Sequence, residues 1–297
     1  AAGDEAAARR PAYFPGEDAS QSLSIGLAEE GSGSGISLAS SSFATDSLAY
    51  QASFIAGAWS GELRALPQTS DGGLGDPQWR ASSTLSDDKH SNFTAPANRT
   101  ILTNVRQNCS ANNSYKAVEF RFDDIGNESG CLDLTRAKVD YLRGVRNGER
   151  ANGGEFRNRN SNILGDIVHS TPLYVGAPNR VRYPADWNDL LRDGNETTPE
   201  DTATPYYSPK GDSYALNADR TKMVYVGAND GMLHGFDAQT GAERLAFIPG
   251  ALLGAVGELT EPNYRHRYYV DESPTSGDVI IGNEWRTVLV GGLGAGG

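Results

Sequence analysis

Histidines and carboxylates are the side chains of this sequence that could perform acid–base or metal chemistry. None of the four histidines stands at zinc-ligand spacing from another: His90, His169, His234 and His266. His234 lies between Leu233 and Gly235 on an expected inner strand, which favours a hydrogen-bonded packing role. The chain has no G-x-S-x-G nucleophile elbow and no carboxylate pair arranged for glycoside hydrolysis. We therefore expect no catalytic residue and no enzyme activity.

Two acidic motifs have alternative readings as metal sites. Asp18–Ser22 (DASQS) matches the metal-coordinating D-x-S-x-S loop of von Willebrand factor A domains. That loop should follow a buried apolar strand, whereas here it follows Tyr13–Glu17 (YFPGE), so we interpret Asp18 as a helix N-cap. Asn229–Gly231 together with Asp237 could form a calcium loop, but hairpin-turn chemistry explains them without a metal. The sequence predicts no metal and no cofactor in this segment.

The chain has two cysteines, Cys109 and Cys131, in a region rich in Asn and Gly. An isolated pair in such a loop-rich region predicts one disulfide. The bond would close a loop of roughly 20 residues and contribute on the order of 3 kcal/mol through the unfolded state. The alternative is a pair of free buried thiols.

Composition limits the class of protein. The formal net charge is −12 over 297 residues, and such an acidic chain is repelled by phosphates, so we expect no nucleic-acid partner. No run of about 18 apolar residues occurs, so we expect no membrane span. Ala1–Arg10 lacks the apolar core of a signal peptide, which indicates that the leader was removed or that the sequence starts inside a longer protein.

Short strands separated by turn residues account for most of the chain from Ser47 onward, and its 35 glycines argue against a helical bundle. The expected strands are 48–55, 61–66, 77–81, 99–106, 115–122, 163–176, 222–229, 232–237, 244–249, 267–271, 277–282 and 286–291. Residues 132–147 have apolar positions closer to helical spacing. Residues 18–30 predict a short helix, and 29–42 predict a flexible connection.

Internal similarity is the most informative pattern. Val224–Phe247 reads as three strands joined by turns at Asn229-Asp230-Gly231 and at Thr240-Gly241. The same order of strand and turn occurs in Leu48–Gln68, and a third unit runs from Ser273 to Gly291. Repeated antiparallel units of this kind are typical of propeller blades, with chance similarity of Gly-rich β-proteins as the alternative.

These patterns predict an all-β chain, an incomplete β-propeller of about three blades with a small helical insertion and a loop-rich N-terminal segment. The expected layout is 1–42 as a linker or the end of a preceding domain, 43–106 as a first blade-like unit, 107–162 as an insertion with the disulfide and a short helix, and 163–297 as truncated blades. Propellers need about four to eight blades, so we expect residues beyond Gly297 to complete the ring.

Specific motifs resemble the propeller of the PilC/PilY family of type IV pilus tip adhesins. They are VYVGANDGMLHGFDAQTG at 224–241, SPTSGDV at 273–279 and RTVLVGGLGAGG at 286–297. AYQASFIAGAWSGELRAL at 49–66 and FRNRNSNILGDIVHSTPLYVG at 156–176 fit the same family. The resemblance covers roughly residues 43–297.

The resemblance implies a secreted protein at the pilus tip or outer cell surface, acting in pilus assembly and adhesion without catalysis. Its implied partners are minor pilins and a host or abiotic surface. Several family members bind calcium through an acidic, EF-hand-like loop in the propeller. This segment has no such run, so the resemblance implies a calcium site beyond Gly297. The alternative is a pyrroloquinoline quinone-dependent dehydrogenase, whose repeats are similar but carry a Trp after the TG turn, where this chain has Phe247.

Overall fold

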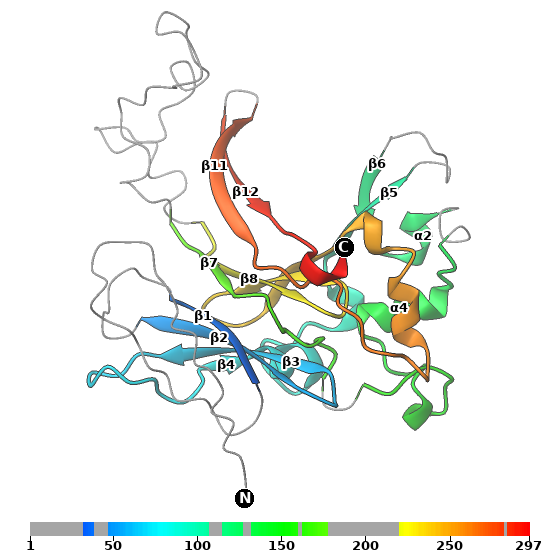
Figure 1. Cartoon of the computed structure of the whole chain (residues 1–297), viewed down its shortest axis with the longest axis horizontal. Coiled ribbons are helices and arrows are strands. Elements are labelled where there is room, and N and C mark those ends of the chain that lie inside the picture. Colours follow the sequence, from blue (N-terminus) through cyan, green and yellow to red (C-terminus); the bar gives the residue numbers. More distant parts are fainter. Residues whose placement is uncertain are drawn as a thin grey trace, which may run out of the picture.

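The computed structural model describes residues 32–38, 47–106, 115–126, 132–159, 162–177, 220–281 and 284–297. Within them the chain is mostly β, with short helices gathered at one end (Figure 1). The expected helix at 18–30, the D-x-S-x-S motif, and both Cys109 and Cys131 lie outside the described residues.

The first sheet is an antiparallel meander of four strands in chain order. It contains β1 (Ser32–Leu38), β2 (Leu48–Ile55), β3 (Ser60–Pro67) and the two-residue β4 (Trp79–Arg80). β2 and β3 pair along their whole length, from Leu48 opposite Pro67 to Ile55 opposite Ser60. The flexible connection expected over 29–42 is wrong for β1, because Ser32–Leu38 gains backbone hydrogen bonds by pairing with β2.

The second sheet has six strands in the order β6-β5-β10-β9-β8-β7. Its strands are β5 (Ile101–Arg106), β6 (Tyr115–Glu119), β7 (Leu173–Val175), β8 (Met223–Ala228), β9 (Met232–Asp237) and β10 (Glu243–Ile248). All neighbours are antiparallel except β5 and β10, which are parallel. β5, placed by sequence in the first unit, therefore belongs to the second sheet.

The β8-β9-β10 meander at the centre of this sheet is the three-stranded unit that the sequence pattern predicts over Val224–Phe247. Every residue of β9 is buried. A strand covered on both faces is buried throughout rather than alternately, and here both layers of the core contact the meander.

β11 (Thr275–Ile281) and β12 (Glu284–Val290) form a separate two-stranded hairpin that projects from the molecule (Figure 1). The strand expected at 267–271 is wrong, because these residues form an irregular segment. Its Tyr269, Val270 and Asp271 are buried, and Tyr269 donates its backbone N–H to the Asn229 side chain instead of to a strand ladder.

Helical elements are short. The α-helices are α1 (Ala81–Ser86), α2 (Phe122–Ile125) and α4 (Arg136–Arg143), and the 3₁₀ turns are η1 (Pro96–Asn98), η3 (Arg150–Asn152), η4 (Gly250–Leu252), η5 (Val256–Thr260) and η6 (Gly294–Gly296). α4 lies in the segment with helical spacing. Thr135 caps its N-terminus by accepting from the Lys138 N–H, and Gly144 ends it with a φ of 115°.

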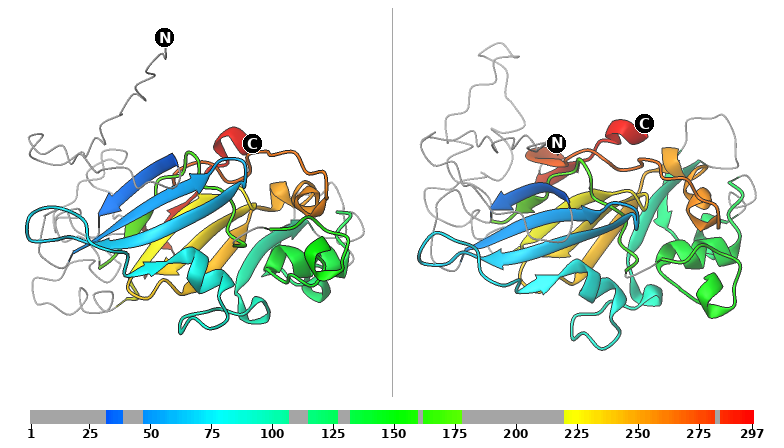
Figure 2. Two further views of the ribbon diagram at one scale, coloured as in Figure 1. Left: turned by 90° about the horizontal axis from the view of Figure 1, so that it is seen from below. Right: turned by 60° about the horizontal axis from the view of Figure 1, so that its bottom comes forward.

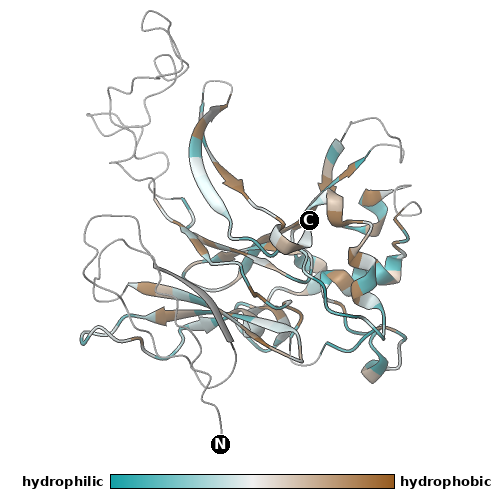
Figure 3. Ribbon diagram, in the orientation of Figure 1, coloured by the Kyte–Doolittle hydropathy of each residue, from teal (hydrophilic) through white to brown (hydrophobic). Residues whose placement is uncertain are grey.

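Two apolar clusters form the core on opposite faces of the meander. One packs β5, β9 and β10 against α4 and η5, with Phe120, Val139 and Val256 fully buried. The other packs the first sheet onto β8 and β9 through Tyr50, Leu63 and other side chains. Figure 2 shows the first sheet lying over the central strands of the second, and Figure 3 shows apolar residues along the strands of both sheets.

The first sheet is fixed to the β9–β10 turn by two aromatic residues. Tyr50 O–H and Trp79 Nε1–H both donate to the Ala238 carbonyl, at 3.1 and 3.0 Å. The Trp79 ring lies so close to Gly241 that a Cβ there would meet the ring at 2.5 Å. The sheets of the described part do not close into a ring, and this part contains no helix long and apolar enough to cross a membrane.

Candidate binding site at the blade turn

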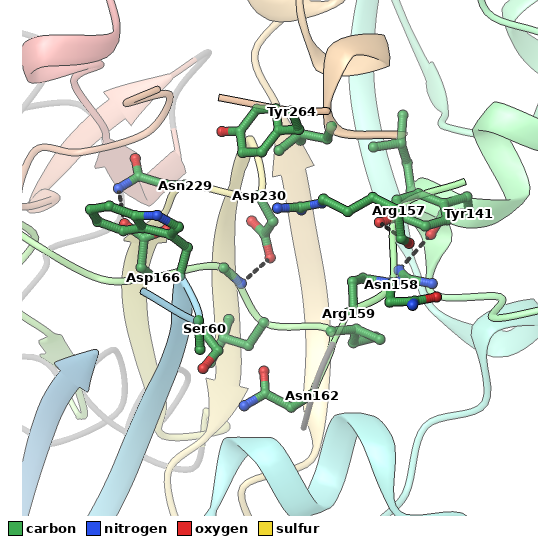
Figure 4. Close-up of a pocket in the computed structure, with 17 residues that line it drawn as sticks. Ser60, Tyr141, Arg157, Asn158, Arg159, Asn162, Asp166, Asn229, Asp230 and Tyr264 are labelled. Atoms are coloured by element: carbon green, nitrogen blue, oxygen red, sulfur yellow. Dashed lines mark hydrogen bonds between the residues drawn. The ribbon is translucent and has the colours of Figure 1, made fainter. Parts of the chain in front are cut away.

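The first candidate site is a small pocket where the β8–β9 turn meets the first sheet and the 157–166 segment (Figure 4). We call it the junction pocket. Polar side chains from five parts of the chain line it: Ser60, Tyr141, Arg157, Asn158, Arg159, Asn162, Asp166, Asn229, Asp230 and Tyr264. The remaining wall is apolar or backbone: Ala58, Trp59, Leu142, Ile163, Leu164, Gly165 and Leu259.

The β8–β9 turn is built by its own three residues. Gly231 has a φ of 90°, a conformation that L side chains rarely adopt, and a Cβ there would meet Val256 Cγ1 at 2.7 Å. Asp230 Oδ1 accepts from the Met232 N–H at 3.2 Å, which ties the turn to β9. Asn229, Asp230 and Gly231 therefore make the turn that the sequence predicts, and the first two also line the pocket.

Asp230 also holds the 162–166 segment against the turn. Its Oδ2 accepts from the Gly165 N–H at 3.0 Å. Gly165 lies directly on the turn, since a Cβ at this position would fall against the Asp230 backbone N. This close approach requires glycine and brings Leu164 and Asp166 into the pocket wall.

Asn229 and Asp166 link the turn to the irregular 264–271 segment. Asn229 donates from Nδ2 to Asp166 Oδ2 at 2.8 Å and accepts from the Tyr269 N–H at 2.9 Å. Asp166 Oδ2 also contacts His266 Nε2 at 2.8 Å. The His266 ring stacks on Trp59, with ring centroids 3.6 Å apart, so the β2–β3 hairpin joins the same network.

A buried ionic chain runs from the turn into the sheet. His234 Nε2 lies 3.1 Å from both oxygens of Asp230, and His234 Nδ1 lies 2.8 Å from Glu243 Oε1. Arg99 donates to both oxygens of Glu243, from Nε at 2.5 Å and from the second guanidinium nitrogen at 2.8 Å. His234 is fully buried, and Arg99 and Glu243 are almost so.

The pKa shifts in this chain follow from its alternating charges. Burial acts to lower the pKa of His234, but the Asp230 and Glu243 carboxylates outweigh burial and raise it from 6.5 to about 9. Burial acts to raise the pKa of Glu243, but Arg99 and His234 outweigh it and lower it from 4.5 to about 2. The pKa of Asp230 is lowered too, because His234 outweighs burial. At neutral pH two carboxylates therefore face two cations, and none of the four is a poised general base.

Two arginines connect the helical insertion to this chain. Arg99 donates to the Arg143 carbonyl at 2.8 Å, and Arg143 donates back to the Arg99 carbonyl at 2.7 Å. Arg143 also donates to the carbonyls of Phe120 and Pro96, each at 3.0 Å. α4 and the β5 strand are thus fixed to β10 by charge-assisted hydrogen bonds.

Comparison with known proteins shows which family this part of the chain resembles. Residues 164–297 match the family model described as the PilY1 β-propeller domain. This segment belongs to the PilY1 β-propeller family. The matched range contains the blade turn, the β8-β9-β10 meander and the β11–β12 hairpin, and its open sheets are consistent with an incomplete propeller.

Curated PilY1 proteins extend the similarity upstream of the matched domain. The "Type IV pilus biogenesis factor PilY1 homolog" of Xylella fastidiosa strain Temecula1 is 38% identical over 271 residues, which cover 90% of this chain and 19% of that protein. The "Type IV pilus biogenesis factor PilY1" of Pseudomonas aeruginosa strain UCBPP-PA14 is 34% identical over 270 residues, 84% of this chain and 20% of that protein. The chain spans about a fifth of the length of these relatives. No solved structure matches it.

The second predicted turn of the PilY1 blade lies outside the junction pocket. Thr240 and Gly241 connect β9 to β10, and Gly241 has a φ of 69°. Asp237 accepts from the N–H groups of Gln239 and Thr240 at 3.0 and 3.1 Å, so the residue weighed as a calcium ligand caps a turn. Within the described residues no three His, Cys, Asp or Glu side chains are placed to hold a metal ion.

Sequence reasoning missed most of the pocket. Arg157, Asn162 and Asp166 lie in the family-like stretch 156–176, but no pattern there indicated a binding site, and Trp59 and His266 are over 200 positions apart. Glycine offered a usable signal: Gly165 and Gly61 each lie where a Cβ would collide with backbone. Gly165 lines the pocket, and Gly61 directly follows Ser60 of its wall.

Proposed function

We propose that this chain is part of a tip-associated assembly factor and adhesin of type IV pili, and that it acts by binding rather than catalysis. The observation that carries the proposal is similarity over 84–90% of the chain to proteins named type IV pilus biogenesis factors. The chain spans only about a fifth of the length of those proteins, so the role of the whole protein is a proposal for this chain.

The chemistry of the junction pocket supports binding. A general base or nucleophile needs a group whose proton is free to move, whereas Asp230, His234 and Glu243 neutralise one another in a buried chain. The network instead joins the first sheet, the insertion and the blade, which suits a surface that holds its loops in fixed positions for binding.

The proposed partners are minor pilins at the pilus tip and a host or abiotic surface, and the proposed location is extracellular at the tip or outer surface. Calcium is proposed to bind in the propeller outside this segment. The described residues give no cluster for it here.

Pull-down with purified minor pilins tests the assembly role. We expect the 297-residue chain to retain minor pilins and not the major pilin, and in-frame deletion of residues 164–297 from the encoded protein to reduce sheared surface pili. Unchanged piliation after deletion, with the remaining protein still produced and exported, would overturn the proposal.

An activity assay separates binding from catalysis. The chain is incubated with pyrroloquinoline quinone, calcium and a primary alcohol, and dye reduction is followed. We expect no turnover above a heat-denatured control. Alcohol oxidation that saturates with quinone would favour the dehydrogenase alternative.

A further inference from the structure

A second cavity, of about 360 Å³, lies beside the junction pocket and shares Ser60 and Asn162 with it. We call it the serine cavity, because five of its lining residues are Ser53, Ser60, Ser82, Ser83 and Ser86. The other lining residues come from β2, β3, β4, the end of α1 and the loop before β7: Phe54, Ile55, Gly61, Glu62, Arg64, Arg80, Asp87, which follows α1, and Asn162. Cavities of this size hold small organic molecules.

Unpartnered polar atoms converge on this cavity. Of the described residues, four have a buried side-chain N or O with no hydrogen-bond partner, and three of these line the serine cavity: Ser60 Oγ, Arg64 Nε and Asn162 Oδ1. Ser60 and Asn162 are only 5% and 7% exposed. Burying such groups without a partner costs about 1–3 kcal/mol each, so their clustering calls for a ligand or bound water.

The orientation of the Asn162 amide is fixed by its other end. Nδ2 donates to the Gly61 carbonyl at 3.1 Å, which leaves Oδ1 as the acceptor. The cavity therefore offers donors at Arg64 and Ser60 and an acceptor at Asn162. A complementary ligand must carry both acceptors and a donor.

The charged residues of the cavity are not equivalent. Glu62 accepts from the backbone N–H and the hydroxyl of Ser82, at 3.0 and 2.5 Å, and lies 4.0 Å from Arg80. The Arg64 Nε is buried without a hydrogen-bond partner, and the Arg64 side chain forms no ion pair within the described part of the chain. One cation is thus available among hydroxyls, which suits a singly charged anion such as a carboxylate, while Glu62 and exposed Asp87 disfavour a dianion.

Backbone pairing argues against a peptide ligand. Ser53 and Phe54 pair with β1 on one side and with Glu62 and Gly61 of β3 on the other, and the Gly61 N–H bonds to the Leu164 carbonyl. Extended peptides bind by adding to an open strand edge, and the cavity has no such edge at these residues. Its polar surface consists of side chains, dominated by hydroxyls that both donate and accept.

We propose that the serine cavity binds a hydroxylated monocarboxylate of the sugar-acid class. Its carboxylate pairs with Arg64 and Ser60, and a ligand hydroxyl donates to Asn162. Ile55, which lies opposite Ser60 in the β2–β3 register and therefore on the same face, offers an apolar surface to the C–H face of the ring. This inference is independent of the pilus role, since it rests on the cavity alone.

Titration calorimetry with D-glucuronate and D-galacturonate tests the proposal, with D-glucose and N-acetyl-aspartate amide as comparison ligands. The 297-residue chain is used with Val279→Lys and Ile281→Lys, which replace two exposed apolar side chains outside the cavity to limit self-association. We expect at least one uronate to bind, with glucose and the aspartate derivative about tenfold weaker or silent. Equal binding of glucose would overturn the carboxylate assignment. Binding of only the aspartate derivative would overturn the sugar-acid class, and binding of none would show a cavity that holds water alone.

Arg64→Gln and Ser60→Ala locate the site. Both should weaken uronate binding by about tenfold without lowering the melting temperature, because neither unpartnered atom stabilises the free protein. Arg286→Gln, an exposed arginine on β12, is the matched control and should bind as the parent chain does. Unchanged binding in both cavity variants would overturn the assignment of the site.

Discussion

At the scale of single residues, several buried charged side chains of this protein lie where the blade turn meets the helical insertion. The Asp230–His234–Glu243–Arg99 chain alternates in charge and is buried, and it connects the blade turn to the insertion. Removing one member of such a buried set leaves an uncompensated charge, which is far more damaging than removing an exposed ion pair.

His234 should therefore give the protein a pH-dependent stability. Its pKa is raised in the folded state, so its contribution is complete below pH 6.5 and is lost as pH rises through about 9, a change of roughly 3 kcal/mol. Urea unfolding at pH 6, 7.5 and 9 measures this loss. We expect His234→Gln to be destabilised by about 3–5 kcal/mol at pH 6 and to lack this slope.

His90→Gln is the control for the histidine prediction. His90 is only partly buried and accepts one local backbone hydrogen bond, from Asn92, so its replacement should leave the slope unchanged. A parent chain whose stability is the same at pH 6 and pH 9 would contradict a charged His234.

At the scale of elements, contacts between backbone segments set the geometry of the junction. Gly165 is the position where this geometry can be tested most directly, because a side chain there would meet the backbone of the β8–β9 turn, which cannot move aside as a side chain can. We expect Gly165→Ala to separate the 162–166 segment from Asp230 and to cost about 1–3 kcal/mol in thermal or urea unfolding.

Gly254→Ala is the matched substitution, because a Cβ at Gly254 has no atom within 4 Å. This variant should be neutral or slightly stabilising, since alanine reduces the entropy of the unfolded chain. Equal stability of the two variants would show that the close approach of Gly165 to the turn does not contribute to the stability of the fold.

The cysteine pair belongs to the insertion. We expect Cys109 and Cys131 to resist alkylation in the non-reduced, unfolded chain and to react after reduction, as read by intact mass. Cys109→Ser with Cys131→Ser should lower stability by about 3 kcal/mol under oxidising conditions. Two alkylated thiols without reductant would instead support free cysteines.

At the scale of the whole molecule, the β11–β12 hairpin is the surface most prone to self-association. Val279, Ile281 and Val290 are 40%, 58% and 55% exposed, and their register places them on one face of the hairpin. Exposed apolar strands with free edges are typical aggregation sites.

We therefore expect the isolated 297-residue chain to elute from size-exclusion chromatography as oligomers or aggregate. Val279→Lys with Ile281→Lys should shift it toward monomer, whereas Thr275→Lys on the same face should do so less. A monodisperse parent monomer with a cooperative melt would contradict this expectation.

The sequence by itself determined the local units of this protein. Asn229-Asp230-Gly231 and Thr240-Gly241 specify turns because their conformations suit few other residues, so β8, β9 and β10 could be predicted. The spacing of apolar residues indicated α4, and the resemblance of the quoted motifs implied a PilY-type propeller. Local backbone preference carries no information about which distant segments meet. It therefore did not indicate that β1 pairs with β2, that β5 joins β10, or that Arg267–Asp271 is irregular.

Only the tertiary structure decided the sites. His234 was predicted to be hydrogen-bonded, but its charge depends on Glu243 and Asp230 lying on either side of its ring. Ser60, Arg64 and Asn162 are ordinary loop and strand residues in the sequence, and they become a candidate binding site because packing buries them without partners. Burial and hydrogen bonding are properties of the packed chain, and they depend on residues that are far apart in the sequence, as in the contact of Asn162 with Gly61 about a hundred positions away.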